Sequence, residues 1–206
     1  MSDGLARLWA GWRLAYVTAA AEAERTAGAS GPPDPVVAGE LAPGQVEGCV
    51  LCRVIAPAGD DRAALVVWRG ERCVAVLNAF PYGSGHLMVL PLRHAAELEQ
   101  LAADEAAELW DGVRRAVIAI KAAYQPDGLN VGANLGRAAG AGVPGHLHIH
   151  VLPRWAGDTN FMTSVAGTRV MPEALADSWV KLTGSWPAGP ERSGGPGGGP
   201  AGAPPE

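Results

Sequence analysis

Short runs of apolar residues in the middle of the chain have the length and composition of β-strands. Such runs lie at residues 65–68, 73–77, 86–90, 129–134 and 146–152. Many of their positions are β-branched or alternate between polar and apolar, as in strands with one buried face. A glycine-containing turn separates the first two runs, so the sequence predicts that these two strands form a hairpin.

Two segments instead carry apolar residues at helical spacing. Residues 102–124 do so over their whole length, and Asp104 and Glu105 lie near the start, where negative charge favours a helix. A short helix is expected to begin at Pro172 and run to about residue 182. Strands before and after one long helix predict an α+β fold with an antiparallel sheet and a short C-terminal helix.

The ends of the chain differ from this middle part in composition. Residues 1–27 are expected to form a helical arm, and residues 28–48 a Pro/Gly-rich linker. The folded domain is expected to span residues 49–186, followed by a disordered Gly/Pro-rich tail at 187–206. An apolar stripe on the arm would pack on the domain or on a second subunit, and it comprises Leu5, Leu8, Trp9, Trp12 and Tyr16.

Composition and charge exclude several classes of function. The 206 residues include 16 Lys and Arg against 21 Asp and Glu, a formal charge of −5. Without a long basic run, we expect no binding to nucleic acid. No apolar run approaches the roughly 18 residues of a membrane span, so we expect a cytoplasmic protein with no membrane partner. Its 3 cysteines are then more plausible as ligands or thiols than as disulfides.

Three histidines alternate with apolar residues in the last predicted strand. His146, His148 and His150 would point to one face of the sheet, and Leu147, Ile149 and Val151 would point to the core. The outer two histidines are ~13 Å apart along an extended strand, so one metal ion is unlikely to bind all three. A lone histidine is usually a hydrogen-bonded structural residue, but three on one face favour a functional site.

A neutral imidazole is a nucleophile at pH 7, and phosphorus is a fitting target for it. Negative charge on the phosphate oxygens then requires hydrogen-bond donors nearby. Residues 130–142 contain Asn130, Asn134 and several glycines, which would let backbone N–H groups approach phosphate. The same segment is equally compatible with a flexible turn.

The three cysteines are open to more than one interpretation. Cys49 and Cys52 form a CxxC pair, which occurs in redox sites, in metal sites and by coincidence. The βαβ context of a redox motif is absent, so we expect no redox cofactor. Cys73 lies in an apolar run and is expected to be a buried thiol.

Residues 146–152 resemble the His-φ-His-φ-His-φ-φ signature of the histidine triad (HIT) superfamily of nucleotide hydrolases and transferases. Residues 85–94, 130–142 and 153–162 resemble its bacterial branch of dinucleoside-polyphosphate phosphorylases and ATP adenylyltransferases. The resemblance implies a HIT-like fold, an adenine dinucleoside polyphosphate as substrate, and a homodimer with a shared sheet.

By the same resemblance, His148 would be the catalytic nucleophile, His150 would contact the phosphate, and His146 would support the site. Asn78 would hold the ribose hydroxyls, and Asn134 would contact phosphate during catalysis. From the residues alone, Asn78 is as well explained as a turn residue.

The resemblance also implies a structural zinc ion bound by Cys49, Cys52, His94 and His146. Four protein ligands leave no open position, so the metal would fix the strand end and not take part in the chemistry. Trp155 would stack on a base, although packing at a subunit interface explains it equally well.

The expected reaction is cleavage of diadenosine tetraphosphate through a nucleotidyl-histidine intermediate. Related hydrolases and phosphoramidases carry Gln and then Ser or Thr before the first triad histidine, whereas this chain has a small-residue loop. The backbone N–H groups of Ala141 and Gly142 would there bind a phosphate acceptor. The alternatives are a hydrolase that uses water, a phosphoramidase, and a non-catalytic zinc-stabilised nucleotide-binding module.

Overall fold

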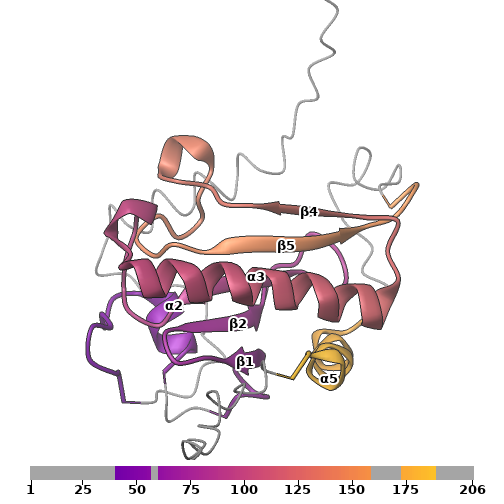
Figure 1. Cartoon of the computed structure of the whole chain (residues 1–206), viewed down its shortest axis with the longest axis horizontal. Helices are drawn as coiled ribbons and strands as arrows, with labels where there is room; N and C mark the ends of the chain where they lie inside the picture. The colour runs from indigo at the N-terminus through magenta and orange to yellow at the C-terminus, as the bar shows by residue number, and fades with distance from the viewer. Residues whose placement is uncertain (1–39, 57–59, 159–172, 189–206) are drawn as a thin grey trace, which may run out of the picture.

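The computed structural model describes residues 40–56, 60–158 and 173–188, which form an α+β fold built on one antiparallel sheet (Figure 1). The strand order is β1-β2-β3-β5-β4, and every neighbouring pair is antiparallel. The strands are β1 Val66–Arg69, β2 Cys73–Leu77, β3 Leu87–Pro91, β4 Gly128–Gly132 and β5 Ile149–Arg154.

One long helix covers one face of this sheet (Figure 1). The helices are α2 Val50–Val54, α3 Ala103–Tyr124 and α5 Leu175–Ser185, with the short 3-10 helices η1 Leu98–Gln100 and η2 Arg137–Ala139. Helix α5 packs on α3 and β1, at the hairpin side of the sheet. In the part of the chain that the structure describes, none of the helices has the length and hydropathy needed to span a membrane.

The sheet has a buried cluster on each face. Beneath α3, Val89, Ile149 and Val151 pack with Leu109 and Ile120 of the helix. On the opposite face, α2 covers a second cluster that contains Cys52, Val76, Met88 and Leu90. Leu147, Ile149 and Val151 all belong to the cluster beneath α3, which confirms that this side of the alternating segment points into the core.

The predicted hairpin and long helix are confirmed, whereas several strand ends differ from the prediction by one to three residues. β4 ends at Gly132 and not at residue 134. β5 begins at Ile149, three residues after the predicted start at His146. Before β5 the backbone N–H of Leu147 donates to Ala95 O (2.7 Å), and Pro91 O bonds to the His146 ring (2.9 Å). These bonds replace the strand ladder.

Several of the expected segments lie outside the described residues. These are the arm at 1–27, most of the linker, the start of the last helix at Pro172 and the tail beyond residue 188. The described end of the expected linker is packed on the domain: Leu41 contacts the cluster under α2, and Gln45 Nε2 donates to Leu92 O. Packed residues therefore begin before Cys49.

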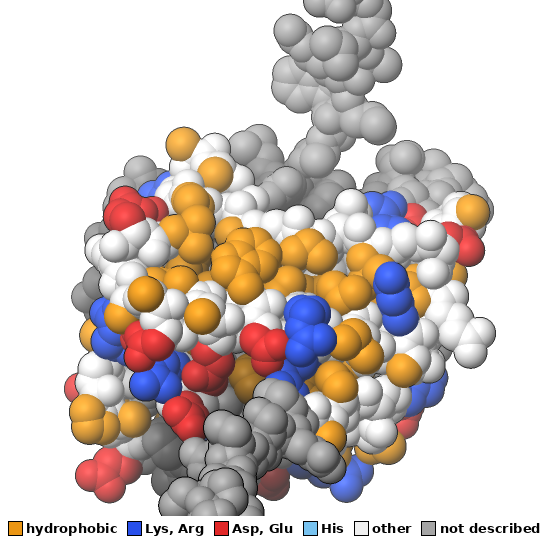
Figure 2. Space-filling model, viewed as in Figure 1, with side chains coloured by type: hydrophobic (Ala, Val, Ile, Leu, Met, Phe, Trp, Pro, Cys, Tyr) orange, Lys and Arg blue, Asp and Glu red, His pale blue; other side chains and the backbone are white. Residues whose placement is uncertain are grey.

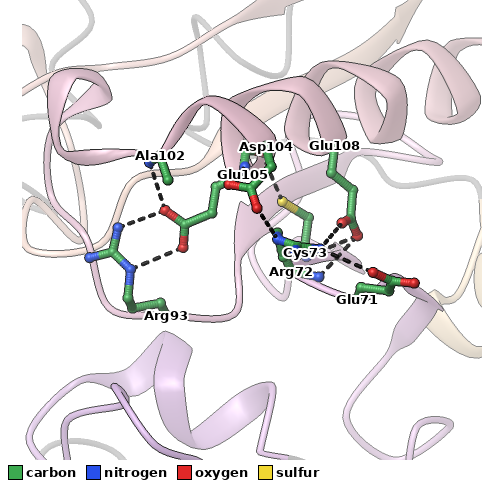
Figure 3. A network of polar contacts seen from close by, with 8 residues as sticks. All are labelled: Glu71, Arg72, Cys73, Arg93, Ala102, Asp104, Glu105 and Glu108. Carbon is green, nitrogen blue, oxygen red and sulfur yellow. Dashed lines mark hydrogen bonds and ion pairs between the residues drawn. The ribbon is translucent and has the colours of Figure 1, made fainter.

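A polar network joins the start of α3 to the β1–β2 turn and to the end of β3 (Figure 3). Glu105 accepts two hydrogen bonds from Arg93, at 3.0 and 2.7 Å, and one from the backbone N–H of Ala102. Glu108 accepts from the backbone N–H of Cys73. Cys73 is fully buried, as expected, and burial raises the pKa of its thiol to about 12.

The network makes a testable contribution to acid stability. The hydrogen bonds from Arg93 lower the pKa of Glu105 to about 2, from 4.5. The stabilisation is therefore complete above about pH 4.5 and is lost as the pH falls towards 2. Because Arg93 is half-exposed, we expect Glu105→Gln to lower the free energy of unfolding at pH 7 by about 1–2 kcal/mol.

Urea unfolding of both proteins between pH 2 and pH 7 measures this effect. The difference between wild type and Glu105→Gln should shrink with falling pH. Glu99→Gln removes an exposed carboxylate on η1 and serves as the matched control. A difference that stays constant over this range would contradict the assignment to Glu105.

Candidate active site and metal centre

His148 is a buried histidine whose ring is held by a backbone carbonyl. It is 7% exposed, and its Nδ1 lies 2.7 Å from the carbonyl oxygen of His146. A carbonyl only accepts, so the proton is on Nδ1 and Nε2 carries the lone pair. Burial lowers the pKa of His148 below its usual 6.5, which keeps the ring neutral. Nε2 of His148 is thus available as a nucleophile at neutral pH.

The orientation of His150 is set by a chain of hydrogen bonds. The backbone N–H of Tyr82 donates to His86 Nδ1 (3.1 Å), so the proton of a neutral His86 is on Nε2. His86 Nε2 lies 2.9 Å from His150 Nδ1 and donates to it. His150 therefore keeps its proton on Nε2. Its ring centroid is 4.9 Å from that of His148, which places a donor beside the nucleophile.

His86 is a site residue that the sequence analysis did not identify. His86 is fully buried and directly precedes β3, whereas the sequence predicted only that it would be the first residue of a strand. The sequence offered one signal, a glycine and a histidine directly before an apolar run, and in the structure Gly85 has a φ of 72° that favours glycine. Its partner could not be inferred without the pairing of β3 with β5.

The two asparagines lie at different edges of the histidine group. Gly132, the last residue of β4, pairs with His150, and Asn134 follows it two residues later. Asn78 directly follows β2, and its Oδ1 accepts the backbone N–H of Phe80 at 2.9 Å. Asn78 therefore makes the turn that its position before Pro81 suggested.

The small-residue loop leads directly into the histidine segment. Its Ala141 N–H donates to Gly136 O over a long 3.4 Å, and His146 N–H donates to Val143 O at the same distance. Among the described residues, Gly142 N–H has no hydrogen-bond partner. Of the two backbone donors expected here, Ala141 is therefore already hydrogen-bonded within the loop.

Trp155 and Arg154 lie at the other end of β5. Trp155 lies seven residues after His148, about 23 Å along an extended chain, and its ring contacts Tyr124 edge to face instead. Arg154 forms a two-pronged ion pair with Asp158 and also donates to Asn130 Oδ1. Within one protomer, the structure does not bring either residue to the histidine group.

The structure brings together the four expected metal ligands. One ligand atom from each of Cys49, Cys52, His94 and His146 lies within 4.8 Å of the other three. The sulfur-to-nitrogen distances are 3.4 Å for Cys52 to His94 and 3.5 Å for either cysteine to His146. Tetrahedral zinc with bonds of about 2.3 Å to sulfur and 2.05 Å to nitrogen requires about 3.6 Å.

The protonation states also fit a metal. His146 Nε2 donates to Pro91 O at 2.9 Å, so its Nδ1 lone pair points to the cysteine sulfurs. Burial lowers the pKa of His146 to about 4, which keeps this ring neutral, as a metal ligand must be. Burial also raises the pKa of Cys52 to about 11, so the thiolate form needs a nearby cation.

The comparisons with known proteins agree with this geometry. The HIT domain family model matches residues 61–157. A protein named AP-4-A phosphorylase from Mycobacterium tuberculosis is 39% identical over 184 residues, which are 89% of this chain and 86% of that protein. An uncharacterized HIT-like protein from Saccharolobus solfataricus is 33% identical over 114 residues, 55% of this chain and 79% of the relative.

Solved structures show the same fold. A zinc-bound histidine triad family protein from Mycobacterium smegmatis has a TM-score of 0.54 and 26% identity, with 67% of this chain and 92% of that one covered. A hypothetical histidine triad nucleotide-binding protein from Sulfolobus tokodaii has a TM-score of 0.50 and 31% identity, with 59% of this chain and 82% of that one covered. The chain belongs to the HIT family.

Proposed function

We propose that the protein is a phosphorylase that cleaves diadenosine tetraphosphate into ATP and ADP. The observation that carries this proposal is the neutral, buried His148, whose Nδ1–H is held by the His146 carbonyl while Nε2 keeps its lone pair. A fixed, deprotonated nitrogen next to a proton donor is what nucleophilic attack on phosphorus needs. The 39% identical relative named AP-4-A phosphorylase supports the choice of substrate.

The reaction proceeds in two displacements. In the first, His148 Nε2 attacks the α-phosphorus, a P–N bond forms, and the bond to the bridging oxygen breaks to release ATP. In the second, an oxygen of inorganic phosphate attacks the same phosphorus, the P–N bond breaks, and ADP leaves. His150 Nε2–H and the Asn134 amide would stabilise the charge on the phosphate oxygens, and Asn78 would bind the ribose.

Phosphate is proposed as the acceptor because of the loop before His146. A Gln and Ser or Thr pair would place side-chain donors here, whereas this chain has residues 141–145 with no polar side chain. The Gly142 N–H has no partner among the described residues and would bind an incoming dianion. Water needs no such donor.

Product analysis tests the proposed function. Purified protein is incubated with diadenosine tetraphosphate, with and without millimolar inorganic phosphate. We expect ATP and ADP in equal amounts, with sustained turnover only when phosphate is present. ATP and AMP formed at the same rate without phosphate would establish a hydrolase, and no products in either case would leave a nucleotide-binding module.

Gly142→Gln is expected to slow phosphorolysis at least about tenfold, because the added side chain fills the space beside the backbone donor. Residual hydrolysis should fall less, so the ratio of AMP to ADP should rise. Gly128→Ala, a glycine whose added Cβ would meet nothing within 4 Å, serves as the control. An unchanged ratio of products in Gly142→Gln would remove the loop from the choice of acceptor.

His86→Phe is expected to lower kcat about 10- to 100-fold with little change in KM, because His150 loses the donor that fixes its Nε2–H. His86→Gln can still donate and should recover part of the rate. Thermal unfolding of both variants separates this effect from misfolding. A well-folded His86→Phe with wild-type kcat would show that His86 does not position His150.

A structural zinc ion is part of the proposal. Cys49, Cys52, His94 and His146 would hold it, and the ion would supply the positive charge that keeps two buried sulfurs as thiolates. His146 takes part in both sites: its Nδ1 faces the cysteines and its carbonyl oxygen holds His148. Metal binding would therefore fix the backbone that orients the nucleophile.

The proposal also includes a homodimer. Trp110 and Ile118, one face of α3, are 55% and 40% exposed, and Val131 of the edge strand β4 is 44% exposed. Figure 2 shows hydrophobic side chains gathered in a band over α3 and beside it. If the β4 edges of two subunits paired, the sheet would extend across both subunits, and the exposed side chains on α3 would be covered. Sedimentation of wild type and Trp110→Glu tests this arrangement, and a wild-type monomer would contradict it.

A further inference from the structure

The loop between β2 and β3 presents two aromatic side chains at the edge of the histidine site. Phe80 is 71% exposed, more than any other large hydrophobic side chain among the described residues. Tyr82 is 37% exposed. Exposure of a phenyl ring to water is unfavourable, so a ring held outside the core beside a reaction centre suggests a ligand.

Residues of the site itself hold this loop in place. Asn78 Oδ1 accepts the backbone N–H of Phe80 at 2.9 Å, and His86 Nδ1 accepts that of Tyr82 at 3.1 Å. The backbone N–H of Asn78 donates to His86 O at 2.9 Å and closes the loop at its base. Pro81 restricts the backbone between the two aromatic residues. The backbone of the loop is therefore fixed relative to the histidines, and the Tyr82 ring packs on His86.

The Tyr82 ring of this loop lies next to His86 and His150. The Tyr82 ring centroid is 4.8 Å from that of His86 and 6.1 Å from that of His150, and His150 is 4.9 Å from His148. In an in-line displacement the leaving group departs on the side of phosphorus opposite the nucleophile. A phosphate chain that extends from the reacting phosphorus past His150 would therefore run towards the loop.

We propose that Phe80 and Tyr82 form a stacking platform for the base of the departing nucleotide, the second nucleoside of a dinucleoside polyphosphate. This inference rests on the proposed function and adds to it the reason for a dinucleotide substrate. Every base has a flat π-face that stacks on aromatic rings. An exposed ring offers only one open face, which suits a product that must dissociate after each turnover.

Phe80→Ala tests the platform without disturbing the histidines, whereas replacing Tyr82 would also remove a ring packed on His86. Two reactions are compared. Phosphorolysis of diadenosine tetraphosphate needs both nucleosides. The second reaction is the exchange of labelled phosphate into ADP. In it, His148 first takes the adenylyl group from ADP and releases phosphate, and labelled phosphate then removes that group to give labelled ADP. Only the nucleotide bound to His148 takes part.

We expect Phe80→Ala to raise KM for diadenosine tetraphosphate about tenfold, with kcat within about twofold of wild type. The KM for ADP in the exchange should rise far less, and Phe80→Tyr should restore tight binding of the dinucleotide. Val180→Ala, an equally apolar exposed position on α5, should leave both reactions unchanged.

Each other result overturns the platform. Equal losses in both reactions would assign Phe80 to the first nucleotide or to folding, and no loss in either would leave it without a role in binding. A changed subunit number in Phe80→Ala would make the ring a subunit contact. If wild-type protein exchanges phosphate into ADP but leaves diadenosine tetraphosphate intact, the proposed substrate itself is wrong.

Discussion

Replacing His148 by alanine is expected to reduce turnover of diadenosine tetraphosphate by about 10⁴-fold or more. The variant has no nitrogen to form the covalent intermediate, and residues that act together with a nucleophile cannot replace it. The lost hydrogen bond leaves the His146 carbonyl without its ring partner, a cost of about 1–2 kcal/mol in unfolding free energy. The fold and nucleotide binding should therefore survive.

Steady-state rates and equilibrium binding of the dinucleotide measure this prediction. His150→Ala is the matched control: it removes the neighbouring ring, and it should slow the reaction while the covalent intermediate still forms. If folded His148→Ala retained a tenth of the wild-type kcat, another group would be the nucleophile.

Loss of the metal is expected to have the largest effect on stability. Purified protein should contain about one zinc ion per chain, and Cys49→Ser or His94→Ala should lose both the metal and several kcal/mol of unfolding free energy. Without the ion, Cys49→Ser leaves Cys52 and both histidines without a metal partner, and His94→Ala leaves both cysteines and His146 without one. Metal analysis and thermal unfolding on the same samples measure the two effects together.

Cys73→Ala separates metal loss from ordinary damage to the core. Cys73 is as buried as Cys52, but its sulfur contacts the Glu105 carbonyl and not the ligand group. This variant should lose stability and keep its metal. If wild-type protein contained no metal and were fully stable, the two cysteines and two histidines would be packed side chains and not a metal site.

Local patterns predicted the elements that depend on neighbouring residues. The hairpin followed from two apolar runs around Gly70, and the long helix from its apolar period and its two early carboxylates. The face of the histidines followed from the period of two, and Leu147 in the core cluster confirms it. These features arise within a few residues of sequence, so one chain is enough to infer them.

Contacts between distant residues could not be predicted in the same way. β5 starts late because the backbone N–H of Leu147 bonds to Ala95 O and the His146 ring bonds to Pro91 O, 55 residues away. His86 joins the site through His150, 64 residues away. Both depend on how β3 and β5 pair, which no spacing in the sequence specifies. The metal ligands were expected only through the family resemblance, and the fold brings them together from three segments.

The most direct measurement of the central claim is intact mass spectrometry of the protein mixed with diadenosine tetraphosphate and quenched, first without and then with phosphate. Without phosphate, we expect one adenylyl group per chain, mapped to His148, and one equivalent of ATP released. Phosphate should then remove the adduct and produce an equal amount of ADP. Turnover without any adduct, an adduct on another residue, or its release as AMP regardless of phosphate would contradict the account.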